Sequence, residues 1–112
     1  MINTTHTSEV DALVTELVRR LRECLPAERI YLFGSRARDE ADENSDFDFL
    51  VVVPNSSLPR YKREQQAFRA LCGLGVSKDV LVFTHDEFEH GRKVITSLPA
   101  TVDREGKLLY VG

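Results

Sequence analysis

Apolar side chains recur at helical spacing near the start of the chain. Over residues 9–25 they stand three and four positions apart, at Val10, Leu13, Val14, Leu17, Val18, Leu21 and Leu25. Positions i, i+3, i+4 and i+7 share one face of a helix, so residues 9–25 are predicted to form an amphipathic helix. Ser8, with Asp11 three residues on, is placed to cap the start of this helix, and Pro26 marks its end.

Four short apolar runs predict strands. They cover residues 29–33, 47–53, 78–84 and 107–111, and each is bounded by glycine, proline or polar residues. Residues 47–53 are apolar on both faces, which is typical of a strand buried on both sides. The second cover of this strand is then either the C-terminal helices or another protein.

Further helices are predicted between the strands. One covers residues 36 to about 41. A second begins near Pro59, which suits a first helical turn, and ends at Gly73 and Gly75. Its predicted inner face carries Tyr61, Gln65, Phe68, Leu71 and Cys72. A capping box over residues 84–87 opens a third helix, and residues 97–99 open a fourth, which Gly106 stops.

This order of helices and strands predicts a two-layer α/β domain with a mixed sheet. The 112 residues suffice for one domain with a real core. The net charge of −3 argues against a dedicated nucleic-acid binder, which usually carries a basic excess. Arg60, Lys62 and Arg63 are interpreted as a solvated helix face rather than as a contact to nucleic acid or to an acidic partner.

Cysteine usage and the polar N-terminus favour a cytoplasmic protein. Cys24 and Cys72 match no metal-binding spacing and fall in helix-like segments, so buried reduced thiols are expected. Residues 1–7 are polar, are expected to be disordered, and contain no apolar signal region. No apolar run is long enough to span a membrane.

The candidate chemistry lies where two predicted strands begin or end. Gly34-Ser35 follows the first strand, and after ten residues Asp46 and Asp48 open the second. Side chains in a strand alternate faces, so the two carboxylates project to the same side and repel each other unless a cation lies between them. Mg²⁺ takes oxygen ligands and keeps open positions for substrate phosphates. Gly34 lets a phosphate approach the backbone, and Ser35 adds a hydroxyl at the predicted helix start, where anions bind.

These residues resemble the signature of the nucleotidyltransferase superfamily typified by DNA polymerase beta, a Gly-Ser followed by Asp-x-Asp. Within it, the chain is most similar to the minimal nucleotidyltransferases, the MNT antitoxins that pair with HEPN toxins. The signature matches at Gly34, Ser35, Asp46 and Asp48, and residues 36–38 match its common extension. The likeness is strongest over residues 30–53 and continues more loosely to the end. It implies a polymerase-beta-like core and one minimal nucleotidyltransferase domain over residues 1–112.

The chemistry expected is attack on the α-phosphate of a nucleoside triphosphate. Asp46 and Asp48 would hold two Mg²⁺ ions that clamp the attacking and leaving oxygens. Asp79 opens the third strand, and if the second and third strands are neighbours, three carboxylates converge at one rim. The resemblance implies the same. Asp79 is then either a further metal ligand or the base that accepts the nucleophile's proton, and the plainer alternative is a solvated aspartate at a strand end.

Phosphate binding is expected at the Gly34–Ser35 corner. Arg36 or Arg38 would neutralise charge on the departing pyrophosphate. Arg36 is favoured because it falls in the first predicted helical turn, whereas Arg38 is as readily interpreted as a solvated helix residue.

Three functions remain open from the sequence. The resemblance implies an antitoxin that transfers AMP from ATP, with Mg²⁺, to a tyrosine hydroxyl of a cognate HEPN ribonuclease toxin and so neutralises it. The choice of ATP rests on the resemblance alone. The first alternative is a binding antitoxin with a vestigial nucleotide site. The second is a nucleotidyltransferase that acts on a small molecule, which the short length disfavours because little chain remains for an acceptor-binding domain.

Overall fold

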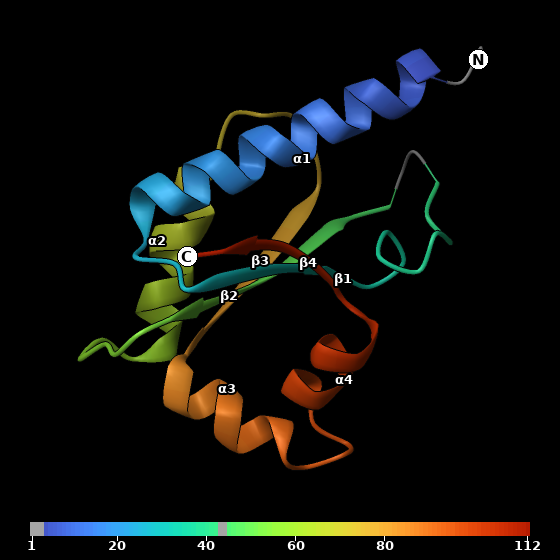
Figure 1. Ribbon diagram of the computed structural model, residues 1–112. Helices are drawn as coiled ribbons and strands as arrows, with labels where there is room; N and C mark the ends of the chain where they lie inside the picture. The colour runs from blue at the N-terminus through green and yellow to red at the C-terminus, as the bar shows by residue number, and fades with distance from the viewer. Residues whose placement is uncertain (1–3, 43–44) are drawn as a thin grey trace.

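The chain folds around a four-stranded mixed sheet (Figure 1). The computed structural model describes residues 4–42 and 45–112. Its elements are α1 (Thr4–Cys24), β1 (Arg29–Phe33), β2 (Phe47–Val53), α2 (Arg60–Ala70), β3 (Lys78–Thr84), α3 (His85–Arg92), α4 (Leu98–Glu105) and β4 (Lys107–Val111). The strand order is β3-β2-β1-β4, with β1 antiparallel to both neighbours and β2 parallel to β3. The predicted mixed α/β fold is confirmed, and the predicted bounds of all four strands match.

Helices cover both faces of this sheet. In Figure 1 the long α1 and the α2 helix lie on one side, and the short α3 and α4 helices lie on the other. The C-terminal helices therefore add a partial third layer to the predicted two. They supply the second cover that the apolar pattern of β2 requires, because Leu50 and Val52 share a buried cluster with Phe88 of α3 and Val102 of α4.

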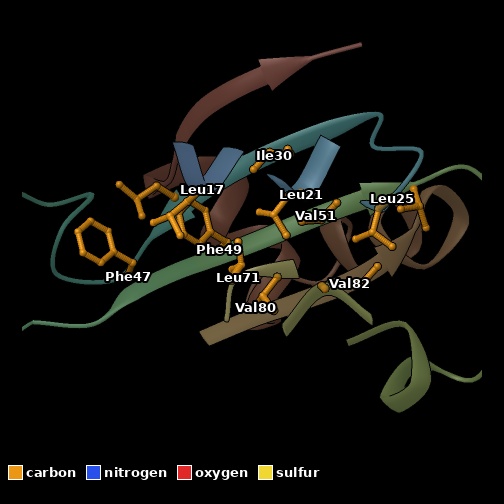
Figure 2. Packing of buried hydrophobic residues seen from close by; sticks show 13 residues of the cluster. Leu17, Leu21, Leu25, Ile30, Phe47, Phe49, Val51, Leu71, Val80 and Val82 are labelled. Carbon is orange, nitrogen blue, oxygen red and sulfur yellow. The ribbon is translucent and has the colours of Figure 1, made fainter. Parts of the chain in front are cut away.

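The larger core cluster lies between the sheet and the first two helices (Figure 2). Leu17 and Leu21 of α1 and Leu71 after α2 pack against Phe49 and Val51 of β2, and all five are fully buried. Burying such a side chain contributes about 1.5–3 kcal/mol. Alternate residues of β2 point into the two clusters, so this strand is held from both sides.

Side-chain caps fix where the C-terminal helices begin. The Thr84 hydroxyl accepts the backbone N–H of Glu87, and the Glu87 carboxylate accepts that of Thr84, which is the predicted capping box. Ser97 caps α4 by accepting the N–H of Ala100, and Gly106 ends that helix, also as predicted. Such caps are each worth about 1 kcal/mol.

Two predicted helix boundaries are wrong. The α1 helix begins at Thr4, so Ser8 lies inside the helix, and residues 4–7 are helical instead of disordered; residues 1–3 fall outside the described part. The reason is that no glycine or proline precedes Ser8 to stop the helix. Residues 35–39 form overlapping turns where a helix over residues 36 to about 41 was predicted, since Asp39 adopts a left-handed conformation with φ of 58°.

The predicted inner face of α2 is also wrong, apart from Leu71. Tyr61 and Phe68 are 61% and 47% exposed, whereas Arg63 and Ala67 are buried. The cause is that α2 lies along the edge strand β3, where polar groups need partners. The Glu64 carboxylate accepts the N–H of Val82 on that edge.

Two smaller predictions, on Arg63 and on the cysteines, are also wrong. The Arg63 guanidinium, predicted to be solvated, is buried in a two-pronged ion pair with Glu87. Cys24 and Cys72, predicted to be buried, are both exposed free thiols.

Within residues 4–42 and 45–112, no helix is both long and apolar enough to cross a membrane.

Candidate active site

Strand register brings the predicted site residues to one rim of the sheet. Phe33, the last residue of β1, pairs with Asp48 on β2, and Asp48 is in turn opposite Asp79 on β3. Gly34 therefore turns away from the sheet directly beside Asp48. The three neighbouring strands meet at this rim, where their pairing brings Gly34, Asp48 and Asp79 together, whereas Asp46 immediately precedes β2 and lies outside this pairing.

Gly34 is a glycine for two reasons that act together. Its φ of 77° is left-handed, a conformation that costs a residue with a Cβ about 1–2 kcal/mol. A Cβ at this position would also overlap the carboxylate oxygen Oδ2 of Asp48. The missing side chain thus leaves room for the Asp48 carboxylate against the backbone of the corner.

The carboxylates at the rim interact electrostatically. Burial raises the pKa of Asp48 above its ordinary value, and the negative charges of Asp46 and Asp79 raise it further. Asp46 and Asp79 themselves are exposed. One carboxylate oxygen of Asp79 accepts the N–H of the next residue, Val80, at 3.0 Å, which restrains its orientation. A cation at this rim would relieve the repulsion that the Asp48 pKa reports.

The Gly34–Ser35 corner offers hydrogen-bond donors. The N–H groups of Ala37 and Arg38 donate to Gly34 O, and that of Glu40 donates to Ser35 O. Among the described residues, the N–H groups of Ser35 and Arg36 donate to no other protein group. Because the expected helix is only a set of turns, any anion bound at the corner would be held by these individual amides and the Ser35 hydroxyl rather than by a helix dipole.

The two arginines of the motif both contact other protein groups. The Arg36 Nε and Nη2 atoms donate to Ser45 O at 3.1 and 2.9 Å, and Nη2 also donates to Asp42 O at 3.2 Å. Its guanidinium carbon lies 3.9 Å from the centre of the Phe47 ring. Arg38 is exposed and pairs with Glu40, and this hydrogen bond raises the pKa of Arg38.

The donor set suits a hard divalent cation shared with a substrate. Within residues 4–42 and 45–112, no three acidic, histidine or cysteine side chains are close enough together to hold a metal ion by themselves. Mg²⁺ is usually bound by one or two carboxylates together with substrate phosphates and water. Asp46 and Asp48 fit that description, because they supply oxygen atoms and uncompensated charge at an accessible rim.

The site is an open rim rather than an enclosed pocket. Two hollows of about 650 and 460 Å³ lie along α1, and both are lined by Arg19 and Glu23. Asp46, Asp48 and Asp79 border neither of these hollows. A triphosphate at the rim would accordingly be open to a large acceptor.

Two features of the site are not evident from sequence. The contact between Gly34 and Asp48 depends on the register of β1 and β2, and spacing alone does not determine register. The packing of Arg36 on Phe47 joins residues from two sides of a loop, and the only hint of it is a basic residue and an aromatic residue flanking the acidic stretch.

Comparisons with known proteins agree with this geometry. A family model described as "Nucleotidyltransferase domain" matches residues 14–102. Protein adenylyltransferase MntA of Thermococcus cleftensis is 36% identical over 69 residues, which are 61% of this chain and 70% of that protein. A Methanocaldococcus jannaschii relative, named provisionally as a protein adenylyltransferase, is 34% identical over 55 residues, 49% of this chain. That match spans only about half, 54%, of the relative's own length.

Two solved structures share the fold. A Sulfolobus solfataricus protein, classed provisionally as a nucleotidyltransferase, superposes with a TM-score of 0.63 at 26% identity, covering 89% of this chain and 78% of that one. A chain of a mutant MntA–HpeT toxin–antitoxin structure gives a TM-score of 0.61 at 22% identity, covering 88% and 72%. The latter identity is low enough that it supports the likeness of fold alone.

Proposed function

Because the chain belongs to the nucleotidyltransferase domain family, we propose that it is a cytoplasmic antitoxin that transfers AMP from ATP to a tyrosine hydroxyl of a HEPN-type ribonuclease toxin. The observation that carries the proposal is the meeting of the Gly34 corner with Asp48 and Asp79 across three neighbouring strands. A phosphate-binding corner beside convergent carboxylates is the arrangement that nucleotidyl transfer needs.

Each residue of the rim has a role in this chemistry. The Ser35 hydroxyl and the N–H groups of Ser35 and Arg36 would bind the triphosphate. Asp46 and Asp48 would hold Mg²⁺, which supplies charge neutralisation on the phosphate oxygens when bound. The acceptor hydroxyl attacks the α-phosphorus, its proton passes to the Asp79 carboxylate, and pyrophosphate leaves. Positioning and electrostatics supply most of the rate.

A protein acceptor agrees with the openness of the rim. Asp46 and Asp79 are exposed, and neither of the two hollows along α1 adjoins them, so a side chain on another protein has access. Relatives are named protein adenylyltransferases, and a structural neighbour is a toxin–antitoxin complex. The HEPN identity of the partner and its tyrosine acceptor follow from the resemblance in sequence. An AMP group beside a ribonuclease site would repel RNA phosphates.

The test is co-expression with the toxin followed by mass spectrometry of the toxin. We expect the wild-type chain to add one or more AMP units and to abolish ribonuclease activity, and Asp46→Ala and Asp48→Ala to add none. Asp86→Ala is a matched control, because it removes an exposed carboxylate at the first turn of α3, at the far end of β3. If the toxin is neutralised with no added mass, and the Asp46 variant protects equally well, the chain is a binding antitoxin.

Asp79→Asn separates the two roles of the third carboxylate. A base acts on the acceptor, so the variant should lose turnover but still bind ATP with Mg²⁺ in calorimetry. Loss of binding would identify Asp79 as a metal ligand first, and unchanged turnover would remove it from the site.

A further inference from the structure

Among the three carboxylates of the rim, Asp46 has the fewest contacts that fix its position. Asp48 is fixed by strand pairing on both sides, and Asp79 by pairing and by the Val80 N–H. The Asp46 side chain is exposed, precedes the first residue of β2, and makes no hydrogen bond or ion pair with any described residue. If Asp46 is to bind a cation beside Asp48, contacts made by the neighbouring residues must fix its position.

The Arg36 side chain holds both neighbours of Asp46. Its Nε and Nη2 atoms donate to the carbonyl of Ser45, the residue before Asp46. Its guanidinium plane lies over the ring of Phe47, the residue after Asp46, at 3.9 Å. Phe47 is itself 3% exposed, lies at the outer end of the core cluster in Figure 2, and donates its N–H to Ser77 O. The core thus supplies a fixed platform for the arginine.

Arg36 also belongs to the phosphate-binding corner. It follows Ser35 directly, and its backbone N–H is one of the donors described above. The same residue therefore connects the corner that would hold the triphosphate with the carboxylate that would hold the metal ion. We infer that Arg36 is a positioning residue that fixes Asp46 relative to the Gly34–Ser35 corner, and this inference rests on the proposed nucleotidyl transfer.

Lysine cannot replace arginine in this role. A guanidinium presents several N–H groups in one plane and stacks on aromatic faces, whereas an ammonium is a compact point charge. A phosphate ligand, in contrast, tolerates lysine far better, because charge alone provides much of the attraction. The Nη1 atom makes no hydrogen bond with the described residues, so direct phosphate contact is the rival role that the experiment must separate.

The experiment compares Arg36→Lys, Arg36→Ala and Phe47→Leu, with Arg92→Lys as the control, because Arg92 is an exposed arginine that pairs with Glu89 within α3 and takes no part in the proposed site. Groups that orient metal ligands typically change metal affinity or activity by about 10- to 100-fold. We expect both Arg36 variants to lower kcat by that factor, with the KM for ATP changed less than about threefold, and Phe47→Leu to act in the same direction. Arg92→Lys should match the wild type.

Two further measurements do not depend on turnover. One is Mn²⁺ binding in the presence of a non-hydrolysable ATP analogue, followed by electron paramagnetic resonance. The other is hydrogen–deuterium exchange of the amides of residues 45–48. Both Arg36 variants should weaken Mn²⁺ binding and speed exchange, and a thermal melt checks that the fold persists.

The outcomes separate the competing roles. If Arg36→Lys is close to wild type while Arg36→Ala raises the KM for ATP, Arg36 is a phosphate ligand and the inference is wrong. Unchanged exchange at residues 45–48 in both variants would also overturn it. If the wild type transfers no nucleotide, the proposed function fails, but Mn²⁺ binding and exchange still decide whether Arg36 positions Asp46.

Discussion

Replacing Gly34 by alanine should lower the rate of nucleotidyl transfer strongly and the stability of the fold only slightly. The same substitution at Gly73 provides a matched control. Both glycines are left-handed, with φ of 77° and 87°. A Cβ at Gly34 would overlap Oδ2 of Asp48, whereas a Cβ at Gly73 meets nothing within 4 Å. The two substitutions share the backbone cost, so the difference between them isolates the contact with Asp48.

The shared backbone cost is modest. A left-handed alanine costs about 1–2 kcal/mol. Replacing glycine also restricts the unfolded chain, which returns about 0.4–1 kcal/mol. The net loss is about 1 kcal/mol at either position, or about 4–8 °C in Tm for a domain of roughly this size.

Gly34→Ala carries an additional effect on the site. The Asp48 carboxylate is the end of a short side chain, so it can turn away from the new methyl group at little further cost in stability. Turning it moves a metal ligand by an ångström or more, and displacements of about 1 Å cost about 100-fold in rate. We therefore expect Gly34→Ala to lower kcat by about 100-fold or more and Gly73→Ala to leave it nearly unchanged.

The assay pairs a thermal melt with transfer of labelled AMP, both on purified protein at neutral pH. The two variants should melt within a few degrees of each other and differ strongly in turnover. The reasoning is refuted if Gly34→Ala retains the turnover of Gly73→Ala, because Asp48 would then not depend on the space beside the corner. A Gly34→Ala melt far below that of Gly73→Ala would show that the overlap disturbs the strands and not only the carboxylate.

Three other predictions concern stability and titration. Burial and neighbouring charge raise the pKa of Asp48, so ionised Asp48 opposes folding. Asp48→Asn should therefore have a higher Tm than the wild type at neutral pH, and the difference in Tm should close as pH falls through the folded-state pKa toward the ordinary value of 3.8. The hydrogen bond with Glu28 raises the pKa of His85, so Glu28→Gln should lower that pKa toward 6.5 in an NMR titration. The His85–Glu28 pair contributes its full stability below pH 6.5, and this contribution is lost as pH rises through the folded-state pKa of His85. Arg63→Ala should lower the free energy of unfolding by about 2 kcal/mol in a urea titration, which is less than for a fully buried ion pair because Glu87 is half exposed. An unchanged urea midpoint would contradict the role of this ion pair.

The sequence is most informative where a residue pattern repeats with the period of its element. The strands were predictable because apolar runs end at glycine, proline or polar residues, and the caps at Thr84 and Ser97 were predictable because a hydroxyl residue precedes each helix. The inner face of α2 was not, because that helix borders a sheet edge. Its orientation there is set by Glu64 and Arg63, whose partners lie 18 and 24 residues away.

The same distinction applies to the candidate site. Gly34, Asp48 and Asp79 could be placed at one rim because the predicted strand bounds put each at or next to a strand end, and aspartate is depleted within strands. The part played by Arg36 was not. Its packing on Phe47 depends on how the chain between them returns to the sheet, and neither period nor propensity encodes that path.

The pairing of Phe33 with Asp48, and of Asp48 with Asp79, has a consequence for how the gene tolerates changes in length. A single inserted residue in β2 or β3 would turn every following side chain of that strand to the opposite face and bring an aspartate under α1 or α2. Residues 55–57, between β2 and α2, are exposed and follow the end of β2 that lies away from Asp48. A peptide tag or a small reporter domain inserted there would leave the strand register and the carboxylates in place, which makes it the place to attach a reporter.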